Sequence, residues 1–400
     1  MHILYLQQLL TLPGSPGTQR SWEMAQYWAE KGHTVSICCS SACLSDSFRS
    51  AHIHSFYSLV SHEGVDLHIL DIPYSHFMSF RDRLRAFYRF YREAYKLMKH
   101  QKGIDIILAY SAPLSSGFLA QKLSQKLNLP FIFELADVWP DVPIGMGIIR
   151  NPILISLLNW QTQKVYKAAS GICTFTEDMK EQLMSHALSS SEVEVIHNGV
   201  NLAQFEVQER ESAGVKVVYS GSLGLANGLS QLLYAWKLIE KKWSEKVSLH
   251  IMGEGNEEEK LRSLADDLGL KALHFHAPIS QQKIADFLAG ADIGLVSVAP
   301  FPVLEANGST KAFEYMAAGL PIVLNYEGWL ASYLEEYTCG LSSPMGYVED
   351  FARNINRLIS DKDLRREMGR NARKLAEEKF DRKQLAQRML EIFEDSLSFI

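Results

Sequence analysis

Short apolar runs alternate with longer amphipathic segments along the N-terminal half of the chain. The apolar runs have the character of strands and cover residues 2–6, 33–39, 104–110, 130–134, 171–175 and 193–196. Segments with the helical period fall between them, as at 21–31 and 116–127. Strands this apolar, separated by helices, are typical of a parallel sheet covered on both faces.

The alternation restarts in the C-terminal half. Expected strands cover 216–220, 247–252, 273–276, 293–298 and 321–324, and polar helices at 347–360 and 363–397 close the chain. A polar, turn-rich segment at 201–214 is typical of a linker. We therefore expect an α/β protein of two Rossmann-like parallel-sheet domains, 1–198 and 199–380, with strand ends facing across a cleft. The last helix, about 381–400, is expected to pack back on the first domain.

Composition excludes several classes of protein. The 400 residues are 47% hydrophobic and 22% charged with a net charge of −6, which is typical of a globular protein and argues against a nucleic-acid binder. We see no signal-peptide pattern and no apolar stretch of about 18 residues, so we expect no membrane-spanning helix. Five cysteines in irregular spacing favour buried thiols in a reducing cytosol over disulfides or zinc ligands.

The segment 309–321 follows an apolar run and carries the strongest candidate chemistry. Ser309 and Thr310 open a short helix, and Lys311 and Glu314 share one of its faces. A helix N-terminus with a lysine suits phosphate oxygens, and a glutamate one turn later can accept hydrogen bonds from sugar hydroxyls. The segment therefore predicts a site for a nucleotide diphosphate.

Two glycine-rich turns follow neighbouring predicted strands. The first contains Gly221, Ser222, Gly224 and Asn227, and the second contains Gly253 and Gly255. Such turns bring backbone N–H groups close to phosphates, although each alone fits an ordinary tight turn. Together with Lys311 and Glu314 they favour a donor-nucleotide site.

Two segments of the N-terminal half are candidates for the acceptor side. The loop with Gly14, Gly17 and Arg20 follows the first strand and could clamp an anion, or could be a plain Gly/Pro turn. Glu134, Asp137 and Trp139 follow another strand, where carboxylates can orient hydroxyls or act as a base and Trp can face a sugar ring. The alternative is a helix cap with solvated charges.

For three histidines and one basic helix, a purely structural role is an alternative to a functional one. His274 and His276 share one strand face but lack a third ligand, so we expect no metal site. His197, at the predicted domain junction, either lines the cleft or is merely part-buried. Residues 81–100, from Arg81 to His100, form a basic, aromatic helix that either contacts an anionic membrane or simply covers the sheet.

Five motifs of the chain belong together. They are Gly-His-Thr-Val at 32–35, Glu-Leu-Ala-Asp-Val-Trp-Pro at 134–140, His-Asn-Gly-Val at 197–200, Tyr-Ser-Gly-Ser-Leu-Gly at 219–224 and Phe-Glu-Tyr-Met-Ala-Ala-Gly-Leu-Pro at 313–321. With these motifs the chain resembles the retaining glycosyltransferases of family 4, with the GT-B fold, in the branch that builds bacterial O-antigens and capsules.

The resemblance implies transfer, with retention, of a sugar from a nucleotide-diphospho-sugar, UDP-linked by expectation, to a lipid-linked or polysaccharide acceptor at the cytoplasmic membrane face. It implies a donor site on the C-terminal domain, an acceptor site on the N-terminal domain, and no metal or further cofactor. It also implies that Glu314 contacts the ribose.

The sequence departs from this family in two places. The usual Glu-x7-Glu motif would put its first Glu at position 306, where Ala306 stands, with Glu305 one position away. Ser222 and Asn227 stand where many members carry an Arg and a Lys that bind the diphosphate. Lys311 is the candidate replacement for those cations, and Arg20 is the second.

Two other functions stay open at this point. A sugar-nucleotide epimerase of the same fold would need no acceptor, and a non-catalytic partner subunit would explain the missing cations. A nicotinamide-dependent dehydrogenase is disfavoured because neither half has the dinucleotide fingerprint with its ribose-binding acid.

Overall fold

The computed structural model describes residues 1–15, 17–75, 78–185, 188, 193–207, 214–243 and 246–398. The chain divides into two compact units, which are described one at a time. Unit 1 comprises 1–197 and 382–400, and unit 2 comprises 198–381. Part of the expected linker, 208–213, lies outside the described residues.

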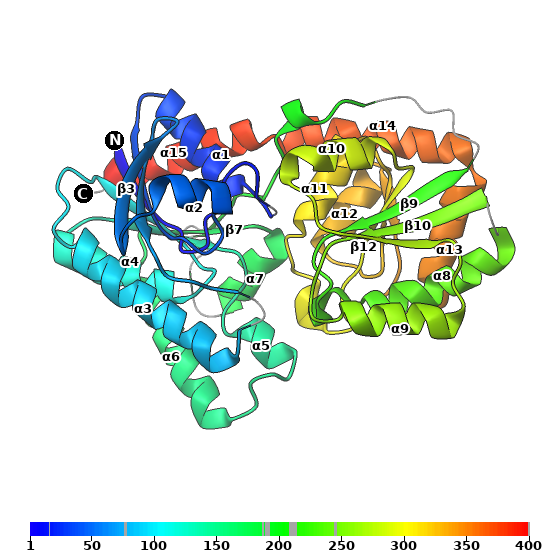
Figure 1. The fold of residues 1–400 in the computed structure, drawn as a ribbon, viewed down its shortest axis with the longest axis horizontal. Coiled ribbons are helices and arrows are strands. Elements are labelled where there is room, and N and C mark those ends of the chain that lie inside the picture. Colours follow the sequence, from blue (N-terminus) through cyan, green and yellow to red (C-terminus); the bar gives the residue numbers. More distant parts are fainter. Residues whose placement is uncertain are drawn as a thin grey trace. The chain divides into compact units, whose positions relative to one another are not determined.

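Unit 1 is built on an eight-stranded sheet in the order β3-β4-β2-β1-β5-β6-β7-β8 (Figure 1). The strands are β1 His2–Leu6, β2 Thr34–Ser40, β3 Tyr57–His62, β4 Val65–Leu70, β5 Ile106–Tyr110, β6 Phe131–Leu135, β7 Gly171–Thr174 and β8 Val193–Val195. Neighbouring strands are parallel except β3 and β4, an antiparallel pair that we did not predict. β3 is an edge strand with little buried surface, and its sequence, like that of β4, lacks the continuous apolar run that marks the predicted strands.

Helices cover the faces of this sheet. They are α1 Arg20–Glu30, α2 Asp46–His52, α3 Phe80–Met98, α4 Ser115–Leu127, α5 Asp141–Gly145, α6 Pro152–Ala168, α7 Glu177–Ser185 and α15 Arg382–Ser398. α15 packs on α1, where Trp28 Nε1 donates to the Ala386 carbonyl over 2.9 Å and the Trp28 ring meets Phe393 edge-on. The C-terminal helix therefore completes the core of unit 1.

The basic helix α3 covers the sheet with its apolar side. Ala86, Phe90, Ala94 and Met98, spaced four residues apart, are buried, while most of its arginines are exposed. The apolar stripe of α3 thus fits the alternative interpretation of residues 81–100, in which the helix covers the sheet. Its outer surface remains basic.

Unit 2 is built on a six-stranded parallel sheet in the order β11-β10-β9-β12-β13-β14. The strands are β9 Val215–Ser220, β10 Val247–Met252, β11 Leu273–His276, β12 Ile293–Val296, β13 Ile322–Leu324 and β14 Gly340–Ser342. The helices are α8 Leu229–Trp243, α9 Glu258–Leu268, α10 Gln281–Ala289, α11 Thr310–Ala317, α12 Trp329–Glu336, α13 Val348–Ser360 and α14 Lys362–Lys379. Short 3-10 turns include Leu225–Asn227 and Pro302–Leu304.

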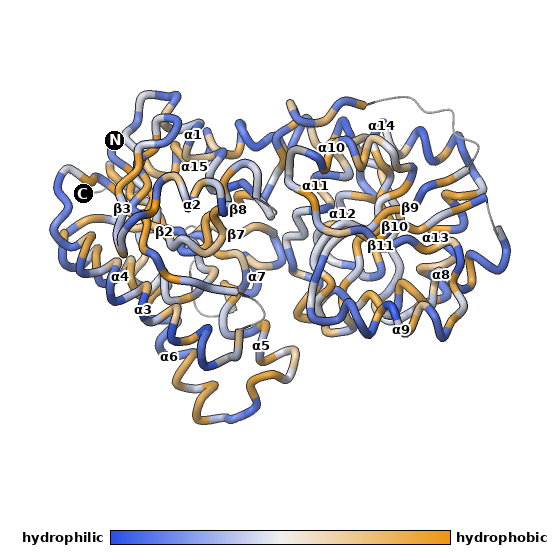
Figure 2. The backbone as a smooth tube through the Cα atoms, in the orientation of Figure 1, coloured by the Kyte–Doolittle hydropathy of each residue, from blue (hydrophilic) through white to orange (hydrophobic). Residues whose placement is uncertain are grey.

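The predicted class, two Rossmann-like α/β domains, is confirmed. In each unit the strands form an apolar centre and the helices turn polar surfaces outward, as Figure 2 shows. Over the described part of the chain, no helix is both long and apolar enough to cross a membrane.

Candidate functional site

The order of strands in unit 2 defines where a ligand can enter. From β9 the chain passes to β10 on one side, and β12 lies on the other side of β9. Ligands of open parallel sheets bind outside the carboxyl ends of the strands at such a switch point. We call the loops that leave these ends, 221–228 after β9, 253–257 after β10 and 297–309 after β12, the switch-point loops.

The two glycine turns pack directly against each other. Gly221 N donates to Met252 O, and Leu223 N donates to Glu254 O, each over 2.9 Å. A Cβ on Gly253 would lie 1.8 Å from Gly221 O, and the φ of Gly253 is +146°, a region that side chains rarely adopt. Gly253 is therefore required by backbone packing, independently of any ligand.

Lys311 lies against the first glycine turn. Its Cε would be 2.8 Å from a Cβ on Gly221, its Nζ is 3.2 Å from Ser309 Oγ, and Nζ lies 5.1 Å from the centre of the Tyr219 ring. Burial lowers the pKa of Lys311 to about 8, and the charge of Glu314 opposes this shift. The fold thus places one poorly solvated amine beside the turn at the switch point.

Two other predicted residues shape this turn. The Ser222 carbonyl accepts a hydrogen bond from Tyr219 OH over 2.9 Å and from Asn227 Nδ2 over 3.0 Å. The side chains of Ser222 and Asn227 carry no positive charge. In the described part of unit 2, the cation that lies against Gly221 is Lys311 of α11. Tyr219, the first residue of the motif at 219–224, thus helps to hold the turn.

The residues around α11 come from several separate segments. Glu314 is nearly buried on the helix, and Thr310 and Glu305 are half-exposed, with Glu305 ending the 3-10 turn before it. Tyr315 OH accepts a hydrogen bond from Ser220 N over 2.7 Å, and Asn198 Nδ2 donates to Gly308 O over 2.6 Å. These contacts fix the start of α11 against β9.

In unit 1, Asp137 lies just beyond the carboxyl end of β6. Burial raises the pKa of its carboxyl group from 3.8 to about 6. Among the residues that the structure describes, no side chain or backbone group hydrogen-bonds to this carboxylate. Trp139 is half-buried two residues later, and its carbonyl accepts a hydrogen bond from Tyr166 OH over 3.0 Å. A carboxyl group poised near neutral pH suits proton transfer.

Arg20 and Glu134 are buried together, which argues against the predicted contact of either side chain with a ligand. They form a buried salt bridge, with exposed side-chain fractions of 2% and 0%. Tyr5 OH donates to Glu134 Oε2 over 2.6 Å, and the Arg20 guanidinium lies 4.7 Å from the centre of the Phe175 ring. These contacts join β1, α1 and β6, so the pair stabilises unit 1. Lys311 thus remains as the candidate replacement for the missing cations.

Several polar side chains near the first loop were missed from the sequence. Within the described part of the chain, polar atoms without a hydrogen-bond partner occur in four nearly buried side chains, Gln7, Gln8, Ser15 and Gln19. Buried amides are normally paired, so these groups are available to a ligand or water. The signal was a run of two glutamines directly after the apolar strand 2–6. Gly14 and Gly17, in the same loop, have φ of +91° and +105°.

The histidines form structural contacts. His250 Nδ1 lies 2.8 Å from His276 Nε2 and the two rings are stacked, while the centre of the His274 ring lies 4.7 Å from that of His250 with the planes tilted by 35°. His197 Nδ1 contacts the Phe175 carbonyl over 2.8 Å. No group of three or more His, Cys, Asp or Glu side chains within the described ranges could hold a metal ion.

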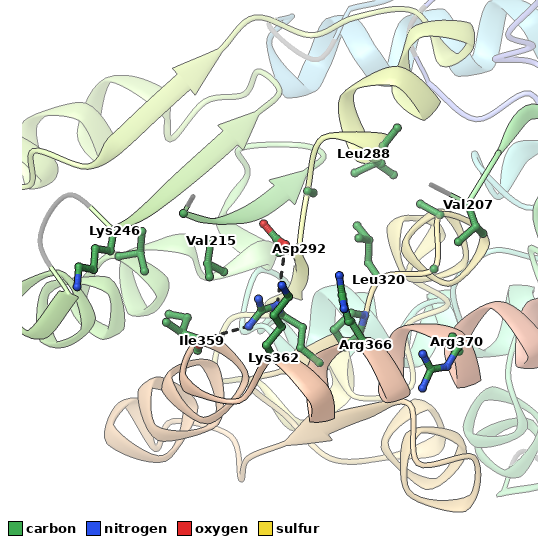
Figure 3. A pocket seen from close by; sticks show the side chains of 18 of the residues that line it. Val207, Val215, Lys246, Leu288, Asp292, Leu320, Ile359, Lys362, Arg366 and Arg370 are labelled. Carbon is green, nitrogen blue, oxygen red and sulfur yellow. Dashed lines mark hydrogen bonds and ion pairs between the residues drawn. The ribbon is translucent and has the colours of Figure 1, made fainter. Parts of the chain in front are cut away.

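A separate cavity of about 290 Å³ lies in unit 2 at the amino ends of the strands, away from the switch-point loops (Figure 3). It adjoins the first residues of β9 and β10 and is lined by the cations Lys246, Lys362, Arg365, Arg366 and Arg370. Arg365 donates to the Leu358 carbonyl over 2.6 Å and lies 3.9 Å from Asp292 Oδ1. None of the predicted donor residues is among its described lining residues.

Two protein-family models match this chain. Residues 18–204 match the family model "Glycosyltransferase Family 4", and residues 202–375 match "Glycosyl transferases group 1". Each match covers a little under half of the chain, the two together span most of it, and both models describe glycosyltransferases.

Curated relatives are distant and matched in part. An uncharacterized glycosyltransferase of Methanocaldococcus jannaschii is 23% identical over 58% of this chain and 59% of the relative. A D-inositol 3-phosphate glycosyltransferase of Streptomyces bingchenggensis is 25% identical over 54% of this chain and 50% of the relative. The chain thus spans between half and three fifths of these relatives.

Solved structures share the fold over the whole chain. A sucrose-phosphate synthase from Thermosynechococcus elongatus has a TM-score of 0.80 at 16% identity, covering 100% of both chains. The Anabaena protein HepE in complex with UDP-glucose has a TM-score of 0.72 at 16% identity, covering 99% of this chain and 100% of that one.

Asp137→Asn should stabilise the protein at neutral and higher pH. The folded-state pKa of Asp137 is raised, so its stabilising contribution is present at low pH and is lost as pH rises through about 6. Asparagine cannot ionise, so the variant should gain about 2–3 kcal/mol in free energy of unfolding at pH 8 and little at pH 4. Denaturant unfolding at both pH values measures this difference. An equal change at the two would contradict it.

Proposed function

We propose that this glycosyltransferase transfers a sugar, with retention, from a nucleotide-diphospho-sugar to a lipid-linked or polysaccharide acceptor in bacterial surface-glycan synthesis. Unit 2 holds the donor and unit 1 holds the acceptor. The observation that carries the proposal is the placement of Lys311 and the N-terminus of α11 against the glycine turn at the unit 2 switch point.

The switch-point loops supply what a departing diphosphate needs. As the bond between the sugar and the diphosphate breaks, negative charge grows on the leaving oxygens, and cations and N–H dipoles that are already in place stabilise it. Lys311 supplies the positive charge, and the helix start supplies dipoles beside it. Glu314, on the same helix, binds ribose hydroxyls, and Glu305 and Ser309 lie on the loop nearby.

The acceptor side uses groups from unit 1. Asp137, whose pKa of about 6 leaves it mostly ionised at neutral pH, accepts a proton from the attacking hydroxyl. Trp139, Gly14 and Gly17 form the wall of the acceptor site. A uridine nucleotide is the donor that we favour, because HepE and a trehalose-6-phosphate protein of the same fold were solved with UDP-linked glucose or its analogue.

We also propose that the protein acts at the cytoplasmic face of the membrane. The exposed arginines of α3 suit an anionic surface, and an acceptor carried by a lipid would be presented there. The O-antigen or capsule pathway is the context that the sequence motifs favour.

A donor-turnover assay tests the proposal. Purified protein is incubated with UDP-sugars, with and without a lipid-linked saccharide, and products are identified by mass spectrometry. Transfer that requires the acceptor supports the proposal. Isomerisation of the donor alone would establish the epimerase, and absence of UDP binding by calorimetry would favour the non-catalytic partner.

Affinity for UDP should fall as pH rises above about 8. The phosphates of UDP are already ionised at pH 8, whereas Lys311 in the free protein loses its proton near this pH. If the bound state needs the ammonium form, affinity falls by up to about tenfold for each pH unit above that point. Calorimetry between pH 7 and 9.5 measures the trend, and Lys311→Arg should flatten it. A pH-independent affinity for the original protein would exclude this role.

A further inference from the structure

The first turns of α6 carry large apolar side chains that are exposed. Ile153, Leu157 and Trp160 follow the spacing of one helix face, and 80% of Ile153 and 56% of Trp160 are exposed. Leu154 and Ile148 add to this surface, which we call the α6 patch. Five large exposed apolar side chains within thirteen residues form a feature that soluble surfaces rarely show.

The location of the patch differs from that of a ligand groove. The C-terminal half of α6 packs into unit 1 through Thr162, Val165 and Tyr166, whereas its N-terminal turns project away from the sheet (Figure 1). In Figure 2 these turns carry hydrophobic colouring at the end of the projection. A projecting apolar helix end can insert into a lipid bilayer, whereas it has no concave surface that could enclose a small molecule.

The charges around the patch have one sign. No Asp or Glu occurs between Asp141 and Glu177, while Arg150, Lys164 and Lys167 lie in that interval. Lys164 Nζ lies 3.5 Å from the centre of the Trp160 ring, so an ammonium group and an indole occupy the same end of the apolar face. Tryptophan and lysine together are characteristic of the boundary between headgroups and acyl chains.

The neighbouring helices extend this positive surface. α4 contacts both α3 and α6, and Lys122 of α4 lies 4.5 Å from the centre of the Tyr95 ring of α3. α3 has six Lys or Arg and two acids, and α4 and α6 have two lysines each and no acid. This excess contrasts with the net charge of −6 for the whole chain.

We propose that the α6 patch inserts into the headgroup region of an anionic lipid bilayer, with the cations of α3, α4 and α6 held at its surface. The proposal deepens the proposed membrane location, and it assigns the apolar anchor to α6 because the apolar stripe of α3 is used in the core. Attraction by charge and burial of apolar side chains act together in such interfacial binding.

Vesicle sedimentation tests the proposal with a matched pair of variants. Ile153→Ser/Leu157→Ser removes two patch residues four positions apart, and Tyr234→Ser/Leu238→Ser removes two comparably exposed residues at the same spacing on α8 of unit 2. The first should reduce partitioning to phosphatidylglycerol-containing vesicles by about tenfold or more, and the second should leave it unchanged. Pure phosphatidylcholine vesicles should bind the original protein much more weakly.

Fluorescence places the insertion at the patch. Anionic vesicles should shift the emission to shorter wavelength, and Trp160→Phe should remove most of this shift. Equal partitioning of the Ile153→Ser/Leu157→Ser variant and the original protein would overturn the proposal. Analytical ultracentrifugation without lipid gives a second test. If the original protein forms a dimer that the same variant dissociates, the patch contacts a second copy of the chain, and the proposal is overturned.

Calorimetry with UDP separates this proposal from the donor function. The patch variants should bind UDP as the original protein does, because their changes lie in unit 1 and the donor residues lie in unit 2. A protein that binds vesicles through the patch but does not bind UDP would refute the donor proposal only.

Discussion

Glu134→Gln should lower the free energy of unfolding by about 3–5 kcal/mol, because the variant leaves a buried guanidinium without its counter-charge. Both partners of the Arg20–Glu134 salt bridge are almost fully shielded from water. Tyr5 OH would also lose a charged acceptor. Denaturant unfolding followed by circular dichroism measures the change.

Two comparison variants make this result specific. Asp82→Asn breaks an exposed pair with Arg85 and should leave the free energy of unfolding nearly unchanged, because solvent screens this pair. Arg20→Met/Glu134→Leu removes both charges together and should recover much of the loss, because no unpaired ion remains in the core. A Glu134→Gln variant as stable as the original protein would show that Arg20 finds another partner.

Lys311→Ala should weaken UDP binding by about 1.5–3 kcal/mol, the value of a hydrogen bond to a charged group. That range corresponds to roughly 10- to 150-fold in affinity. The effect is expected to be large because Ser222 and Asn227 supply no positive charge at the turn that Lys311 contacts. Calorimetry at pH 7, where Lys311 is protonated, measures the difference.

Controls distinguish loss of the ammonium group from general damage. Lys260→Ala removes an exposed lysine from α9 and should leave UDP affinity unchanged. Lys311→Ala should not lower the stability of the free protein, since burial already disfavours its charge. An affinity within about twofold of the original would show that another group carries the diphosphate charge.

The sequence alone was sufficient for the fold class and for most strands. Runs such as 2–6 and 216–220 are apolar because both faces of a parallel sheet are buried, so composition along the chain reports them directly. The edge strand β3 was missed because one side of it meets solvent. The glycines at 221, 253 and 255 were visible as turn signals, although the sequence could not separate backbone packing from phosphate binding.

Only the tertiary structure decided which charged side chains are accessible to a ligand and which are buried in ion pairs. Arg20 and Glu134 are 114 residues apart, so no local pattern shows that they neutralise each other inside unit 1. Lys311 comes to the turn at Gly221 because β9 and β12 are neighbours in the sheet, a pairing that periodicity does not reveal. In the same way, the apolar run in α6 resembles that of a core helix, and only the folded structure shows that the side chains of its first turns are exposed. Burial and partnership are properties of the folded chain, because they depend on contacts between residues distant in sequence.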